Sequence, residues 1–113
     1  MGINVQQDGT RTNTYGFGLG TGREWQGATA VPFKAGEWQH LTIVCDGEQA
    51  VLYVNGVEQS RGPAKGPVAP NPNQNFKLGQ GYHSGRFFHG LLGDVRIYRK
   101  GLSAEEVREL ARK

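Results

Sequence analysis

The chain has 113 residues, including 18 glycines and one cysteine, and its formal net charge is +3. This length fits one domain, and no stretch is apolar and long enough to span a membrane. The basic residues are scattered, which argues against a nucleic-acid-binding surface. The single cysteine, Cys45, excludes an intramolecular disulfide. Its place in the apolar run 41–45 indicates a small buried side chain rather than a nucleophile.

The first third of the chain predicts short strands separated by glycine-rich turns. Residues 3–5 and 15–19 alternate between apolar and small or polar side chains. This period of two predicts two strands, each with one buried face. A third strand is expected within 25–33, before Pro32 and Gly36 interrupt the pattern.

The middle of the chain predicts a three-stranded antiparallel meander. Strands are expected over 37–45, 49–54 and 57–61. Asn55 and Gly56 join the last two, and they predict a type I′ turn because both residue types tolerate a positive φ. Apolar and polar residues alternate along the first of these strands, so its apolar members should share one face.

The last third predicts a long loop, further strands and one short helix. Residues 62–75 hold four prolines and indicate a loop, while strands are expected over 76–78 and within 87–98. Ser103 and Glu106 form a capping box, which predicts a short C-terminal helix. Many short strands without crossover helices favour an all-β sandwich over an α/β fold.

Three segments, in order along the chain, resemble the laminin-G-like domains of the concanavalin A-like lectin/glucanase superfamily. They are residues 36–44 (GEWQHLTIV), residues 52–56 (LYVNG), and residues 88–98 (FHGLLGDVRIY) followed by Leu102, Ser103 and Glu106. The resemblance implies an antiparallel two-sheet jelly-roll sandwich with one short C-terminal helix. It also implies an extracellular or cell-surface location, although the first residues carry no signal-peptide pattern.

The resemblance also bears on the domain's extent. Family domains usually carry further strands before the matched part, and this chain starts too late to include them. We therefore expect a single domain over residues 1–113 that is a fragment of a longer protein. Either residues 1–35 close the sandwich, or partner chains complete it, because a half-complete jelly roll would expose strand edges and apolar faces.

Four residues are candidates for ligand binding. Trp25 lies between polar neighbours, and an aromatic face of this kind can stack on a sugar ring. Tyr82, His83 and Arg86 lie together in a glycine-bounded loop of the type that carries recognition residues. The alternatives are partial burial of Trp25 at a sheet edge and an ordinary hairpin connection for the loop. Trp38 belongs to the matched strand and is expected in the core.

The functional expectation is a non-catalytic carbohydrate-binding module that requires no cofactor. The resemblance implies calcium in some members, with Asp94 as a weak candidate ligand, because Gly93 stands where the family commonly has a further Asp and calcium favours several carboxylates. No strand carries the carboxylate pair that a glycoside hydrolase needs. The expected partners are a glycan or a cell-surface protein. The chain is also expected to form a homo-oligomer. The alternative functions are a protein-interaction or self-assembly module that completes its sandwich by strand pairing between chains and, with less support, a glycoside hydrolase fragment.

Overall fold

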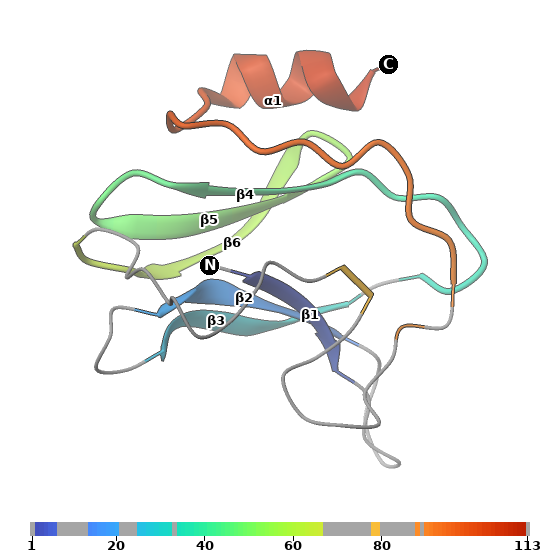
Figure 1. Cartoon of the computed structure of the whole chain (residues 1–113), viewed down its shortest axis with the longest axis horizontal. Helices are drawn as coiled ribbons and strands as arrows, with labels where there is room; N and C mark the ends of the chain where they lie inside the picture. The colour runs from blue at the N-terminus through green and yellow to red at the C-terminus, as the bar shows by residue number, and fades with distance from the viewer. Residues whose placement is uncertain are drawn as a thin grey trace.

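The protein is described by a computed structural model that covers residues 2–6, 14–20, 25–32, 34–66, 78–79, 88 and 90–112. Six antiparallel strands and one helix lie in these residues. They are β1 (Gly2–Gln6), β2 (Thr14–Gly20), β3 (Trp25–Pro32), β4 (Leu41–Cys45), β5 (Gln49–Val54), β6 (Val57–Pro63) and α1 (Ala104–Ala111). The strands form two sheets, ordered β1-β2-β3 and β4-β5-β6 (Figure 1). The fold class is thus all-β with one C-terminal helix, as the sequence predicts.

The first sheet confirms the three strands expected in the first third of the chain. Strands β1 and β2 pair with Ile3 opposite Phe17. Strands β2 and β3 pair with Gly20 opposite Trp25, and the register shifts between Tyr15 and Phe17. Such an irregularity bends a strand and increases its local twist.

The second sheet is the predicted meander. Ile43 lies opposite Leu52 in the β4–β5 pair, and Leu52 lies opposite Ser60 in the β5–β6 pair. The β5–β6 turn has positive φ at both central residues, 52° at Asn55 and 82° at Gly56. The type I′ turn predicted from this dipeptide is therefore confirmed.

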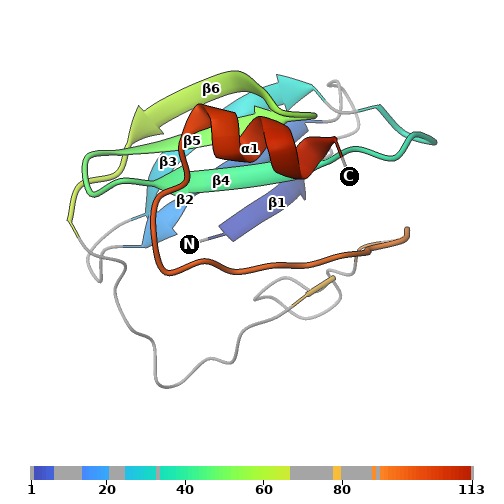
Figure 2. The same ribbon diagram turned by 90° about the horizontal axis from the view of Figure 1, so that it is seen from above.

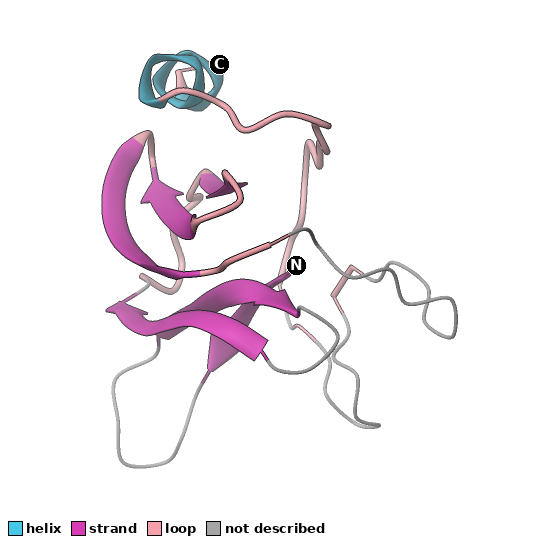
Figure 3. Ribbon diagram, turned by 90° about the vertical axis from the view of Figure 1, so that its left-hand side faces the viewer, coloured by secondary structure: helices cyan, strands magenta, loops and turns pink. Residues whose placement is uncertain are grey.

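Both faces of the central strand of the second sheet, β5, are buried. On one face, Ala50 and Leu52 of β5 are fully buried, together with Ala64. On the other face, Val51 and Tyr53 are more than nine-tenths buried, and Val107 of α1 packs against them. Figure 3 shows the result as three layers, with the helix, the second sheet and the first sheet lying one over another.

The predicted capping box begins helix α1. The Ser103 hydroxyl accepts a hydrogen bond from the Glu106 backbone N–H at 3.1 Å, and the Glu106 carboxylate accepts one from the Ser103 N–H at 3.2 Å. Lys100 donates to the same carboxylate at 2.8 Å. Lys100, followed by the Ser103 backbone, lowers the pKa of Glu106. The helix thus starts where the sequence predicts, and it lies across β4 and β5 when seen from above (Figure 2).

The closing strand expected within 87–98 is absent from residues 88 and 90–98, which are irregular. The prediction of a strand here is wrong for these residues. In the described part of the chain, no neighbouring strand offers them backbone hydrogen bonds, and a β-ladder requires such a partner. Their alternating side chains are consequently exposed.

Strand β4 also differs from its prediction, because it begins at Leu41 rather than at residue 37. Residues 34–40 form a loop before it. No helix among the described residues has the length and apolar character needed to cross a membrane.

Candidate binding surface

The ligand-binding residues predicted from the sequence fall mostly outside the described residues. Trp25 is the first residue of β3, but its side chain is not among those described. Tyr82, His83 and Arg86 lie outside the described residues altogether. Their roles in ligand binding therefore stay predictions.

Trp38 is the largest departure from the expected core. Its side chain is 71% exposed, although the sequence predicts burial. The reason is local: Trp38 precedes the first residue of β4 and lies in the loop 34–40. Residues 88 and 90–98, which belong to the segment expected to close the sheet beside it, form no strand that covers the ring. Trp38 is therefore an aromatic surface and not a core residue.

Hydrogen bonds on both sides hold the loop around Trp38. The Gln39 side chain donates to the carbonyl oxygen of Lys34 at 2.5 Å. The His40 N–H donates to the Asn55 side chain at 2.9 Å, and the Asn55 N–H donates back to the His40 carbonyl at 2.8 Å. A Cβ placed on Gly93 would lie 3.9 Å from the Trp38 ring, so this glycine lies next to the ring. The tryptophan is thus presented by an anchored loop.

The signal that could have identified Trp38 is its pair of neighbours. Both tryptophans have the same flanks, Glu24 and Gln26 around Trp25 and Glu37 and Gln39 around Trp38. Polar flanks favoured a surface position for Trp25, and the same argument applies to Trp38. The place of Trp38 in residues 36–44, the segment that resembles the family, favoured burial instead.

Asp94 is exposed and engaged by an arginine. The Arg96 guanidinium donates to both Asp94 oxygens, at 2.8 and 3.1 Å. Asp94, and then Tyr98, raise the pKa of Arg96 through side-chain hydrogen bonds. The described residues contain no group of three or more His, Cys, Asp or Glu side chains that could hold a metal ion. A cation at Asp94 would have to displace the guanidinium, so the surroundings fit calcium poorly, and its binding stays a prediction.

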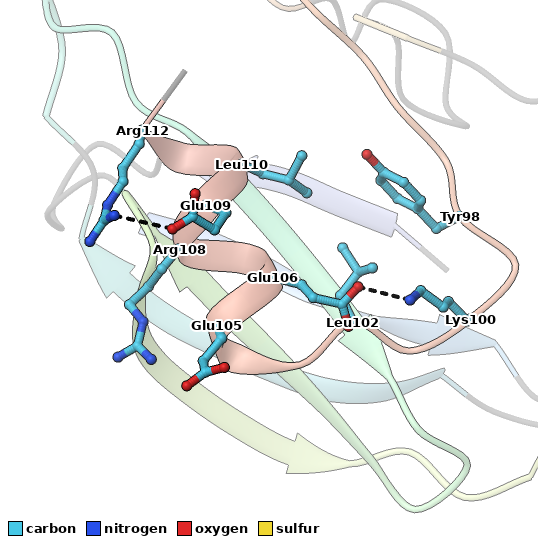
Figure 4. A pocket seen from close by; sticks show the side chains of 9 residues that line it. All are labelled: Tyr98, Lys100, Leu102, Glu105, Glu106, Arg108, Glu109, Leu110 and Arg112. Carbon is cyan, nitrogen blue, oxygen red and sulfur yellow. Dashed lines mark hydrogen bonds and ion pairs between the residues drawn. The ribbon is translucent and has the colours of Figure 1, made fainter.

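A shallow groove of about 770 Å³ lies between α1 and the residues that precede it (Figure 4). Tyr98, Leu102 and Leu110 supply apolar surface to it. Its charged side chains are largely paired with one another, Lys100 with Glu106 at 2.8 Å and Arg112 with Glu109 at 3.1 Å. Exposed ion pairs of this kind contribute little to stability. The groove offers an aromatic edge with charged flanks.

The described carboxylates mostly serve turns and ion pairs. Asp46 accepts hydrogen bonds from the backbone N–H groups of Glu48 and Gln49 at 2.9 and 2.8 Å, which lower its pKa. Glu58 pairs with Arg61. An acid that caps a turn or holds a guanidinium is explained by structure without a catalytic role.

A comparison with family models identifies the superfamily of the chain. The family model for the concanavalin A-like lectin/glucanases superfamily, of the laminin-G type, matches residues 1–108. The chain belongs to this superfamily, whose fold is a β-sandwich. This confirms the resemblance predicted from the sequence.

One solved structure extends the comparison. The chain is similar to the 2.1 Å crystal structure of an S-layer domain-containing protein (residues 221–444) from Clostridium thermocellum. The sequence identity is 18% and the TM-score is 0.62, over 96% of this chain and 55% of that one. At this identity the similarity concerns the fold alone. The chain spans about half the length of that structure.

Proposed function

We propose that the protein is a non-catalytic carbohydrate-binding module in which a sugar ring stacks on Trp38. The supporting observation is this large aromatic ring, 71% exposed and fixed by hydrogen bonds on a loop. Sugars dock on aromatic faces through their C–H surfaces while nearby polar groups bond their hydroxyls. Glu37, which is exposed, and the exposed Lys34 provide such groups on the same loop.

Two further elements of the proposal rest on the family. The two sheets are the layers of a jelly-roll sandwich, and the module acts outside the cell or at its surface. The superfamily description names lectins, and the structural neighbour carries S-layer in its name. Trp25, Tyr82, His83 and Arg86 remain proposed contributors to ligand binding.

Glycan binding by the purified chain tests the proposal. A glycan array followed by calorimetry should find a ligand, and Trp38→Ala should weaken its binding about tenfold or more, corresponding to about 1.4 kcal/mol. Val57→Ala is the matched control, because Val57 is 58% exposed at the start of β6 and lies outside the loop. Equal binding by wild type and Trp38→Ala would contradict the role of Trp38.

The proposal also includes the absence of catalysis. Glycoside hydrolysis needs two carboxyl groups on either side of the scissile bond. Asp46, Glu58 and Glu106 are engaged in a turn, an ion pair and a helix cap. We expect no release of reducing ends from the glycans that bind. Turnover abolished by replacement of one carboxylate would contradict this part.

A second candidate function is self-assembly through strand pairing. The observation that favours it is separate from Trp38. Residues 91–98 expose apolar side chains beside an edge strand.

A further inference from the structure

A second exposed aromatic ring, that of Tyr98, belongs to the segment that passes next to Trp38. Trp38 is 71% exposed and Tyr98 is 43% exposed. Gly93 links the two, because a Cβ at its position would lie 3.9 Å from the Trp38 ring. The chain reaches Tyr98 five residues after Gly93. The two rings therefore lie at the two ends of one short stretch of exposed chain.

This stretch separates the two rings by more than one sugar ring. Residues 94–98 contain no turn or bend, and Figure 2 shows them running straight beside the second sheet. Five residues span at most about 18 Å when they are fully extended. A single sugar ring is too small to contact both aromatic side chains across such a stretch.

Charged side chains connect the two ends. The Arg96 guanidinium donates to both Asp94 oxygens, at 2.8 and 3.1 Å. Asp94 first, and then Tyr98, raise the pKa of Arg96 through side-chain hydrogen bonds, so Arg96 lies between these two side chains. The three residues are spaced by two in the sequence, which places side chains on one side of an extended stretch. Trp38, Asp94, Arg96 and Tyr98 are here called the binding row.

The binding row has the chemistry of a site for a sugar chain. Its aromatic faces can take the apolar C–H surfaces of sugar rings. The side chains of Asp94 and Arg96 are 73% and 49% exposed. A carboxylate has about four acceptor positions and a guanidinium has five N–H donors, more than their mutual ion pair uses. The remaining positions are open to the hydroxyl groups of rings that lie between the two aromatic side chains.

The groove along α1 continues the binding row beyond Tyr98. Tyr98 lines this groove on one side and Leu110 lines it on the other (Figure 4). Its volume of about 770 Å³ is in the range of ligand sites. Lys100 and Glu106 add charged groups to its wall. A sugar chain that passes Tyr98 therefore meets further apolar and polar surface.

We propose that the ligand is a chain of several linked sugar rings, bound along the binding row with one ring on Trp38 and another on Tyr98. This inference rests on the proposed function, to which it adds the length of the ligand and a second aromatic platform. Once one ring has docked, the linkage holds the other rings at a high effective concentration near their sites. Affinity should therefore rise with chain length until both aromatic rings are occupied.

Binding measured against chain length tests the proposal. The probes are cello-, chito- and malto-oligosaccharides from the monosaccharide to the hexasaccharide, together with the size series of any other glycan that the array identifies. In calorimetry, the wild type should bind the hexasaccharide of its series about tenfold or more tightly than the shortest member that binds. Trp38→Ala should weaken the binding of every length. Tyr98→Ala should weaken the hexasaccharide about fivefold and leave the shortest member unchanged.

Matched variants separate the binding row from general effects on the chain. Tyr98→Phe keeps the aromatic ring and should restore most of the affinity that Tyr98→Ala loses. Arg96→Ala should weaken the hexasaccharide about fivefold, because it removes charged hydrogen-bond donors between the rings. Arg61→Ala breaks a comparable exposed ion pair, with Glu58 on β6, and should leave the affinity unchanged. Circular dichroism checks that each variant is folded.

The outcomes distinguish this inference from the proposed function. Affinity that depends on Trp38 but stays constant with chain length would overturn the inference and leave a sugar site at Trp38. Unchanged hexasaccharide affinity in Tyr98→Ala would have the same meaning. If no glycan of the array or of the size series binds, or if Trp38→Ala binds as the wild type does, the proposed function is wrong and this inference is rejected with it.

Discussion

At the residue scale, Gly56 has a double role. Its φ of 82° completes the turn between β5 and β6. A Cβ at this position would lie 3.2 Å from the Ala111 Cβ and 3.2 Å from the Arg108 Cα. The turn therefore needs glycine for its backbone conformation, and helix α1 needs it for close approach. These two requirements can be separated by experiment.

Gly47 provides the comparison. It also has a positive φ, 94°, but no described atom lies within 4 Å of its Cβ position. Gly47→Ala should cost only the left-handed backbone, about 1 kcal/mol of unfolding free energy, whereas Gly56→Ala should cost about 2–4 kcal/mol. Urea unfolding measures both. Equal losses would show that α1 does not press on the turn.

Cys45 illustrates a residue that the sequence describes well. It is partly buried against the Ala50–Leu52 cluster, and burial raises the pKa of its thiol. A raised pKa keeps the thiol protonated and unreactive near neutral pH. This supports the interpretation of Cys45 as a small apolar residue.

At the element scale, two carboxylates fix boundaries. Asp46 holds the turn between β4 and β5, and Glu106 caps α1. Hydrogen bonds to the charged forms lower the pKa of both groups. A lowered pKa in the folded state means that the stabilisation is present above the unfolded pKa, about 4 for these groups, and is lost as the pH falls through the folded values.

The double variant Asp46→Asn/Glu106→Gln tests this linkage. Both amides can still accept the backbone hydrogen bonds, but they do not titrate. The wild-type melting temperature should fall as the pH drops below about 4, and that of the variant should fall less. Glu37→Gln controls for the loss of a negative charge. Identical pH profiles for wild type and double variant would contradict the assignment.

The elements that the sequence predicted correctly are those with local signals. The turn at Asn55 and Gly56 and the cap at Ser103 depend on neighbours a few residues away. The strand expected within 87–98 has the right alternation, but a strand also requires a partner edge. Because that partner is absent from the described residues, alternation alone gave the wrong result for them.

At the scale of the whole molecule, the predictions from the sequence that were wrong concern which side chains are buried. Trp38 and Val95 are exposed because the described sheet ends at β4, which no local pattern reveals. Family membership was predictable, since its three segments are continuous in sequence. The exposed position of Trp38 was not predictable, because it depends on which strands pair with each other in the sheet.

The two candidate functions use different observations on one molecule. Sugar binding rests on the anchored Trp38, and self-assembly rests on the exposed apolar side chains of residues 91–98. A chain that self-associates without binding any glycan would retain the second candidate and reject the first. A monomer that binds glycan through Trp38 would do the reverse.

The most direct measurement for sugar binding is a ¹H–¹⁵N NMR titration with the glycan found by array. The chain has two tryptophans, so its spectrum contains two indole N–H signals. The signal assigned to Trp38, by its loss in Trp38→Phe, should move with saturation. If that signal stays in place while binding saturates, the account of the Trp38 surface is wrong.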